Sequence, residues 1–242
     1  MCTLIVSVGQ HPSAPLVVAA NRDELRSRAA SPPRRWPGED FVAPRDEEAG
    51  GTWLGLTKTG LFVGVTNRFP AERHADRRSR GALVLEALRQ PSAVAVREAL
   101  EGLPVTRYNT FHLLYADARA AFVTWSDGAQ VRHQPLAKGL HVVTERSLGG
   151  DDAGREEVVR RAWPTLEQEA GAPTPSALQR LLATGAPTGV CVDLPAYDYG
   201  TRSALVLTVQ PALAASRWFW AEGRPDRTPF VERPELIAAL LR

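Results

Sequence analysis

Apolar positions in the first 145 residues fall in short runs separated by turn residues, a pattern typical of antiparallel strands. Apolar runs at Thr3–Val8 and Leu16–Ala20 flank the turn-prone Gly9–Ser13, which predicts a β-hairpin with a long loop. A second hairpin is predicted from Thr52–Leu56 and Leu61–Thr66. Further strands are expected at Thr110–Tyr115, Ala121–Trp125, Gln130–His133 and His141–Thr144. Strands therefore dominate this part of the chain.

Proline and helical periodicity divide the remaining segments. Ala30–Pro44 contains four prolines and predicts an irregular excursion over the surface. Helical spacing or capping residues predict helices at Gly81–Leu88, Ser92–Leu100, Glu156–Ala170, Ser176–Leu182 and Pro234–Leu241. Ser92 is expected to cap its helix, Thr174 or Ser176 to cap the fourth helix, and Pro164 to kink or divide the third. The last strands are expected at Ala204–Val209, Arg217–Trp220 and Pro229–Val231.

Strands and helices alternate in blocks, and short hairpins join the strands. This order predicts an α+β layered architecture with antiparallel sheets, not a parallel βαβ sheet. A chain of 242 residues with 44% hydrophobic content can fill one large core, so we expect a single domain over residues 1–242.

Composition narrows the class of protein. No stretch approaches the roughly 18 apolar residues of a membrane span, so we expect a soluble, cytoplasmic protein without stable membrane insertion. A net charge of +2 argues against nucleic acid as a partner. Cys2 and Cys191 are the only cysteines, which fits a reducing compartment, although one bridge between them stays open.

Motifs for several common chemistries are missing. The chain has no glycine-rich phosphate loop, no His-Glu-x-x-His, no Cys-x-x-Cys and no Gly-x-Ser-x-Gly. Its five histidines lack metal-ligand spacing. We therefore expect neither a metal nor a bound cofactor.

Cysteine at the second position is the strongest chemical feature. Removal of Met1 would leave Cys2 with a free α-amine and a thiol on the same residue. An α-amine titrates near ~8 and a thiol near ~8.5, so one residue can serve as nucleophile and base. The alternative is a small packing side chain at the start of a strand, which position alone favours.

A second polar group is expected close to Cys2. Asn21-Arg22-Asp23-Glu24 follows the second strand, and in an antiparallel hairpin the end of that strand lies beside the start of the first. Arg22 would lower the pKa of the Cys2 thiol, and Asp23 would hold or orient the amine. The alternative is a solvated turn with local ion pairs.

Other candidates follow later strands. Asn67 ends a strand and is either an oxyanion donor or a plain turn residue, and Trp53 is either a core residue or a substrate contact. Gly50-Gly51 predicts a close backbone approach to a ligand or a neighbouring strand. Arg68 begins an arginine-rich segment, ending at Arg80, that would attract a carboxylate or phosphate at a pocket rim, unless it is a solvated loop.

Ordered sequence blocks resemble those of the NRDE family, also called the transport and Golgi organisation protein 2 family. The blocks are Met1–Leu4, Ala20–Glu24, Gly50–Gly55, Thr66–Arg68, Ser79–Gly81 and Tyr199–Ser203. The resemblance implies an N-terminal-nucleophile hydrolase-like fold with two antiparallel sheets between helical layers, an αββα sandwich. It also implies a relationship to cysteine-dependent bile-salt hydrolases and penicillin V acylases.

The resemblance implies a set of site residues. Cys2 would be the nucleophile, Asp23 would contact its amine, and Arg22 or Arg202 would be the cationic partner, with Asn67 as a further catalytic candidate. Expected substrate contacts are Asn21, Glu24, Trp53 and Arg68. Two departures weaken the match to the acylases. Their Gly-Arg-x-x-Asp is replaced by Ala20-Asn21-Arg22-Asp23, and Thr144-Glu145 replaces a Ser-Asn step. Glutamate would repel an oxyanion, and losing one such donor costs about 2.7–4 kcal/mol.

Two functional classes follow. The first is an amidohydrolase in which Cys2 attacks the carbonyl of a small acylated amide. The second is a non-catalytic carrier of an amphiphilic acid, such as haem or an acyl thioester. A purely structural protein has less support because it leaves the polar strand ends unexplained.

Overall fold

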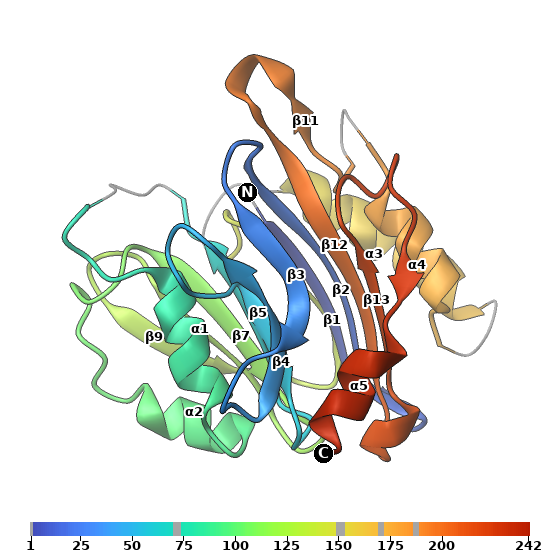
Figure 1. Ribbon diagram of the computed structural model, residues 1–242, viewed down its shortest axis with the longest axis horizontal. Helices are drawn as coiled ribbons and strands as arrows, with labels where there is room; N and C mark the ends of the chain where they lie inside the picture. The colour runs from blue at the N-terminus through green and yellow to red at the C-terminus, as the bar shows by residue number, and fades with distance from the viewer. Residues whose placement is uncertain (1, 70–73, 149–152, 169–171, 186–188) are drawn as a thin grey trace.

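The computed structural model describes residues 2–69, 74–148, 153–168, 172–185 and 189–242. Two antiparallel sheets lie face to face, and helices cover the outer face of each (Figure 1). This α+β, αββα arrangement confirms the expected fold class.

The first sheet contains the hairpin formed by the first two strands of the chain. Its strand order is β10-β1-β2-β12-β13-β14, with β11 paired to β12. The bounds are β1 (Cys2–His11), β2 (Ala14–Leu25), β10 (Gly139–Val143), β11 (Asp193–Leu194), β12 (Tyr199–Val209), β13 (Arg217–Ala221) and β14 (Val231–Glu232).

The second sheet runs in sequence order from β3 to β9, because each strand pairs with the next one along the chain. Its strands are β3 (Ala30–Arg35), β4 (Phe41–Asp46), β5 (Leu54–Thr57), β6 (Phe62–Asn67), β7 (Phe111–Ala116), β8 (Ala121–Ser126) and β9 (Val131–Pro135).

Helices enclose the two sheets. α1 (Arg80–Leu88) and α2 (Ala93–Ala99) cover the second sheet, while α3 (Ala153–Gln168) and α4 (Pro175–Leu182) cover the first (Figure 1). α5 (Pro234–Leu240) buries Leu236, Ile237 and Leu240 in the core between the sheets. Short 3-10 turns lie at η1 (Pro195–Tyr197) and η2 (Leu213–Ala215).

Strand β1 shows why the central strands are mostly apolar. Leu4 and Val6 pack between the sheets, whereas Ile5 packs beneath α3 and α4. Successive side chains of a strand point to opposite faces, so a strand covered on both faces must be apolar at nearly every position. The pattern Thr3–Val8 is buried at each position for this reason.

Local sequence signals located most elements correctly. Both predicted hairpins are present, but the long loop expected at Gly9–Ser13 is wrong, because the strands continue to His11 and from Ala14 and leave only Pro12-Ser13 between them. The hydroxyls of Ser92 and Thr174 accept the N–H groups of Ala95 and Ala177 at the starts of α2 and α4. α3 is not divided at Pro164, because helix continues to Gln168. The expected helical residues 169 and 170 lie outside the described part of the chain.

The prediction of an irregular excursion at Ala30–Pro44 is wrong. These residues form β3 and most of β4, and Phe41 and Val42 are buried. Proline is tolerated because β3 is an edge strand, and its register is irregular between Ser31 and Arg34, where Pro32 and Pro33 lie. Tertiary burial of β4 overrides the proline signal.

The strand expected at His141–Thr144 belongs to the other sheet from its neighbours in sequence. As β10 it pairs with β1, with Leu4 opposite Val143. The chain therefore crosses between the sheets after β9, which brings Thr144 and Glu145 towards the start of β1.

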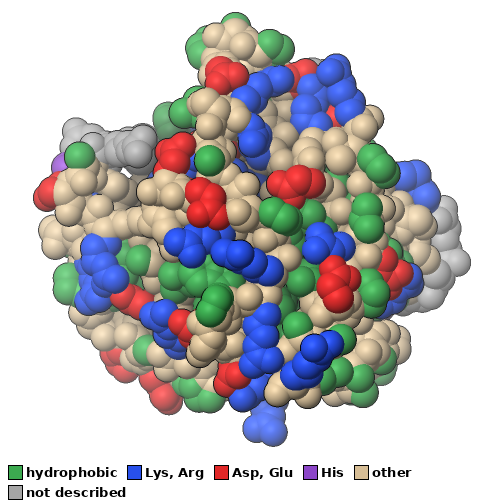
Figure 2. Space-filling view, viewed as in Figure 1, with side chains coloured by type: hydrophobic (Ala, Val, Ile, Leu, Met, Phe, Trp, Pro, Cys, Tyr) green, Lys and Arg blue, Asp and Glu red, His purple; other side chains and the backbone are tan. Residues whose placement is uncertain are grey.

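The described residues were compared with what a nucleic-acid-binding surface or a membrane span requires. Acidic and basic side chains are interspersed on the face seen in Figure 2, without one extended basic area. Within the described ranges, every helix is too short or too polar to cross a bilayer.

A close backbone contact joins two of the glycine-containing blocks. A Cβ added to Gly51 would lie 2.6 Å from the carbonyl carbon of Gly81 at the start of α1. The expected close approach at Gly50-Gly51 is therefore to a helix terminus, and glycine is required because backbone atoms cannot move aside cheaply.

Gly51→Ala is expected to destabilise the protein by about 1–3 kcal/mol, because the added methyl group overpacks this contact. Urea denaturation measures the change. Gly185→Ala is the matched control, since nothing lies within 4 Å of its added Cβ, and it should change stability by less than about 0.5 kcal/mol. Equal effects of the two substitutions would contradict the packing explanation.

Candidate functional site

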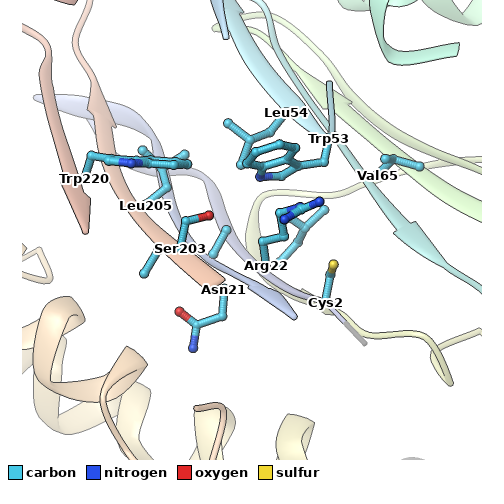
Figure 3. A pocket seen from close by; sticks show the side chains of 12 residues that line it. Cys2, Asn21, Arg22, Trp53, Leu54, Val65, Ser203, Leu205 and Trp220 are labelled. Carbon is cyan, nitrogen blue, oxygen red and sulfur yellow. The ribbon is translucent and has the colours of Figure 1, made fainter. Parts of the chain in front are cut away.

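Three polar side chains lie in a row across the first sheet. Cys2 pairs with Arg22, and Arg22 pairs with Ser203 on its other side. Directly paired residues of neighbouring strands point to the same face. Cys2, Arg22 and Ser203 therefore share the face that looks towards the second sheet, as Figure 3 shows.

A bulge in β12 sets this row. Thr201 pairs with Asp23 and Ser203 with Arg22, so Arg202 is the extra residue between them. Its guanidinium donates to the backbone oxygen of Arg26. The structure thus places Ser203, and not the predicted Arg202, beside Arg22 in the cavity.

The Cys2 thiol is half-buried and lies 3.9 Å from the backbone oxygen of Asp23, to which it donates. Burial raises the pKa of the thiol, and the opposing effect of Arg22 is smaller. Arg22 does lower the pKa of the Cys2 thiol, as expected. The pKa is nevertheless raised overall, because burial has the larger effect. Cys191 is also a free thiol, so the two cysteines are not bridged.

Arg22 is buried between the two sheets. Its guanidinium carbon lies 4.3 Å from the centroid of the Trp53 ring, and its Nη2 lies 3.5 Å from Asp46 and 4.0 Å from Glu24. Arg28 donates to the same Asp46 carboxylate at 2.8 Å. Burial lowers the pKa of Arg22. This network ties β2 to β4 at the mouth of the site.

The segment Asn21–Glu24 is part of β2 and not a solvated turn. Asn21, Arg22 and Asp23 are all buried. The turn interpretation fails because β2 continues to Leu25 and is covered by β12 on one side and by β1 at its start on the other.

Asp23 points to the opposite face from Cys2, under α3. Its Oδ1 accepts from the Thr201 hydroxyl at 2.6 Å, and its Oδ2 lies 3.5 Å from Arg155. The Tyr199 hydroxyl donates to its backbone oxygen at 2.7 Å. Burial raises the pKa of Asp23 to about 7, against the lowering effects of Thr201 and Arg155. This carboxyl therefore titrates near neutral pH.

Arg155 of α3 is a site residue that sequence reasoning missed. It lies between two carboxylates, 3.5 Å from Asp23 and 3.6 Å from Glu145. No motif surrounds Arg155 in the sequence, and only the packing of α3 against the sheet brings it here. Glu145, expected to repel an oxyanion, is buried and faces this arginine.

Two of the expected substrate contacts have structural partners. Asn21 donates to the backbone oxygens of Leu182 and Val190, both at 3.0 Å, and so anchors the end of α4 to β2. Arg68 donates to the backbone oxygens of Ser147 and Leu148 at 2.8 and 3.0 Å. These hydrogen bonds do not direct the Asn21 amide or the Arg68 guanidinium towards Cys2.

Asn67 and the histidine near it lie away from the cavity. Asn67 is exposed at the end of β6 and does not line the space beside Cys2. Burial, with a smaller contribution from Arg68, lowers the pKa of His112 to about 3, so this imidazole is neutral. Its Nδ1 lies 3.1 Å from the Thr66 hydroxyl.

The cavity beside Cys2 is small and mostly apolar. Its volume is about 10 Å³, which leaves room for about one water molecule. Trp53 and Trp220 form one wall, with ring centroids 6.3 Å apart. The lining residues are Cys2, Leu4, Ala20, Asn21, Arg22, Trp53, Leu54, Val65, Ser203, Ala204, Leu205 and Trp220 (Figure 3).

Within the described residues, no cluster of three or more His, Cys, Asp or Glu side chains could hold a metal ion. The polar atoms at the cavity are instead a thiol, a guanidinium and a hydroxyl. Such a set suits nucleophilic attack and hydrogen bonding to an oxygen.

Comparison with known proteins identifies the family. The family model described as "Transport and Golgi organisation 2" matches residues 1–169. The chain belongs to the Transport and Golgi organisation 2 family. The match covers the first three catalytic candidates, Cys2, Arg22 and Asp23, together with Asn67.

Curated relatives agree with this family. A Transport and Golgi organization protein 2 homolog of Bos taurus is 27% identical over 232 residues, covering 80% of this chain and 82% of the relative. The Homo sapiens homolog is 30% identical over 113 residues, covering 44% of this chain and 40% of the relative.

Solved structures show the fold of this Transport and Golgi organisation 2 member. A mutant of the conjugated bile acid hydrolase from Clostridium perfringens aligns with a TM-score of 0.53 at 11% identity, covering 97% of this chain and 93% of that chain. A variant of the same hydrolase aligns with a TM-score of 0.53, covering 96% and 92%. The fold is therefore that of an N-terminal-nucleophile hydrolase.

Asp23→Asn should change how stability depends on pH. The pKa of Asp23 is about 7 in the folded protein and about 3.9 in an unfolded chain. Between these values the folded state binds more protons, so the wild-type free energy of unfolding falls as pH rises. The variant lacks this loss, and its stability relative to wild type should rise by up to about 4 kcal/mol from pH 4 to pH 8. Urea denaturation at both pH values measures this difference.

Asp127→Asn is the control for this titration. Hydrogen bonds from Gln130 and Ala129 hold the pKa of Asp127 below its ordinary value, so its carboxyl is ionised in both states above pH ~5. The stability of this variant relative to wild type should stay level above about pH 5. A level curve for Asp23→Asn as well would disprove the raised pKa.

Two variants around Arg155 should move the Asp23 titration in opposite directions. Glu145 raises the pKa of Asp23 and Arg155 lowers it. Glu145→Gln is therefore expected to lower the midpoint, and Arg155→Met to raise it. Carboxyl ¹³C chemical shifts of Asp23 against pH report the midpoint directly. A shift in the same direction for both variants would show that the two residues are not coupled to Asp23 through charge.

Proposed function

We propose that this protein is an N-terminal cysteine hydrolase that cleaves the C–N bond of a small acylated amide. One observation carries the proposal: the Cys2 thiol and the Arg22 guanidinium lie side by side at a cavity. Asp23 follows Arg22 on β2, past the start of β1, and its carboxyl lies on the opposite face of the sheet. The position of the Cys2 amine therefore has the thiol and the cation on one face and the carboxyl on the other.

The first half of the reaction forms a thioester. After removal of Met1, the Cys2 α-amine accepts the thiol proton, and the thiolate sulfur attacks the amide carbonyl carbon. Negative charge develops on the carbonyl oxygen, and Arg22, which is paired with Cys2 on this face, is the cation that would stabilise it. The C–N bond then breaks, and the ammonium returns its proton to the leaving nitrogen.

The second half releases the acid. Water attacks the thioester carbonyl and gives its proton to the α-amine. The C–S bond breaks, the sulfur regains a proton, and the free acid leaves. Every atom of the amide and of one water is then accounted for in the acid and the amine.

Asp23 has an electrostatic role in this scheme. Its carboxyl is held by Thr201 and Arg155, and it titrates near pH 7. When ionised, it stabilises the ammonium form of the Cys2 amine. We therefore expect hydrolysis to increase as pH rises through about 7.

The comparison with bile acid hydrolase supports this chemistry. That enzyme shares the fold, and one of its solved structures replaces a cysteine at position 2 by alanine. A cysteine occupies the same second position in this chain. By itself the likeness concerns the fold, and the amide substrate of this chain is our inference from the grouping around Cys2.

The alternative is a carrier of haem or an acyl thioester. The described cavity has a volume of about 10 Å³ and is closed by Trp53 and Trp220. A small acyl group needs far less rearrangement of these walls than a haem does. The size of the cavity therefore favours the hydrolase.

Cys2→Ala is expected to abolish hydrolysis of acyl 4-nitroanilides, with a loss of more than about a thousandfold in kcat/KM. Wild-type protein should lack Met1 by intact mass and should show an acyl adduct on Cys2 during turnover. Cys191→Ala is the matched control, since its buried thiol donates to Asp226 and does not line the cavity beside Cys2. It should keep wild-type activity.

The carrier makes the opposite prediction for the same variant. It requires Cys2→Ala to bind haem or an acyl thioester as wild type does, with no acyl adduct at any time. Retention of Met1 in active protein would remove the amine from the mechanism.

A further inference from the structure

We propose that Ser203 selects the acyl group of the substrate by donating a hydrogen bond to an oxygen about four bonds from the reacting carbonyl carbon. This inference rests on the hydrolase proposed above and names its substrate class: amides of short oxo or hydroxy acids. The argument depends on the burial of Ser203, its distance from Cys2 and the walls around it.

The Ser203 hydroxyl is buried without a hydrogen-bond partner. The residue is 4% exposed, and its Oγ contacts no donor or acceptor among the described residues. Buried hydroxyls in native proteins are usually paired, because an unpaired one has lost its bond to water. In Figure 3 the hydroxyl points into the cavity and not into the sheet. A ligand oxygen would provide the missing partner.

The strand register sets the reach from Cys2 to Ser203. Two strand spacings of about 4.8 Å separate them, because Arg22 lies between. Subtracting a C–S bond of about 1.8 Å and a hydrogen bond of about 2.8 Å leaves about 5 Å. Four bonds of an extended acyl chain span about this distance. The oxygen therefore belongs on the fourth carbon of the acyl group.

Two other polar side chains that line the cavity, those of Trp220 and Arg22, have partners. The Trp220 indole donates to Glu222 at 2.6 Å, and Arg22 faces Asp46 and Glu24. Leu205 and Trp53 supply apolar wall. The cavity has room for about one water molecule, so an acyl chain of four or five carbons requires the partly buried Trp53 ring to move aside. Ser203 is then the neutral donor at the far end of that chain.

Matched 4-nitroanilides test the proposal. Pentanoyl and 4-oxopentanoyl amides have the same chain and differ by one oxygen on the fourth carbon, while 6-oxoheptanoyl and heptanoyl amides place it two carbons further. Wild type should prefer 4-oxopentanoyl over pentanoyl by about tenfold in kcat/KM, the value of one hydrogen bond to a buried group. The longer pair should show no such preference.

Ser203→Ala should reduce the tenfold ratio to about one. Ser126→Ala, a buried serine in β8 of the other sheet, should keep the wild-type ratio. A ratio near one in wild type, a ratio that survives Ser203→Ala, or an equal preference in the longer pair overturns the proposal. Thermal melting of both variants checks that each is folded.

A binding measurement separates this inference from the reaction itself. Pentanoate and 4-oxopentanoate are each tested for protection of Cys2 from alkylation by iodoacetamide. Intact-mass measurement detects the alkylated protein. The oxo acid should protect wild type at about tenfold lower concentration, and Ser203→Ala should protect equally with both acids. If no amide is hydrolysed but this difference is found, the hydrolase proposal fails and the Ser203 subsite stands. Equal protection in wild type overturns the subsite.

Discussion

The pairing register of β1, β2 and β12 is the constraint on which the site depends. Because side chains alternate between faces, a slip of one residue would move Cys2 and Arg22 out of the space between the sheets. The bulge at Arg202 adjusts this register once, so that Thr201 can bond Asp23 on one face while Ser203 meets Arg22 on the other. The hydrogen-bonded ladder, and not any single side chain, determines which polar groups meet.

Placing charges inside this sheet requires compensation from distant elements. Burial opposes the charged forms of both Arg22 and Asp23, and their pKa values shift towards neutrality as a result. Asp46 from the second sheet offsets the cation, and Arg155 from α3 offsets the anion. Three of the four layers, all but the layer of α1 and α2, therefore contribute to the electrostatics around Cys2. Buried charges that need such compensation are typical of functional sites.

Local sequence patterns located the elements reliably where the side-chain pattern matches the backbone structure that the segment adopts. Apolar runs located the strands, and hydroxyl caps such as Ser92 located helix starts. They failed where tertiary burial decided the outcome. The prolines of Ala30–Pro44 are accommodated at a sheet edge, and the charges of Asn21–Glu24 continue a buried strand, although both patterns resemble exposed turns.

The sequence by itself determined the strand-rich α+β class, the family blocks and the candidates Cys2, Arg22 and Asp23, since composition, periodicity and motif order are local properties. Only the tertiary structure brought Arg155 and Ser203 to the site and directed Arg202 away from it. Helix packing and a one-residue bulge decide those positions. Neither leaves a periodic signal, because both depend on contacts between residues far apart in the chain.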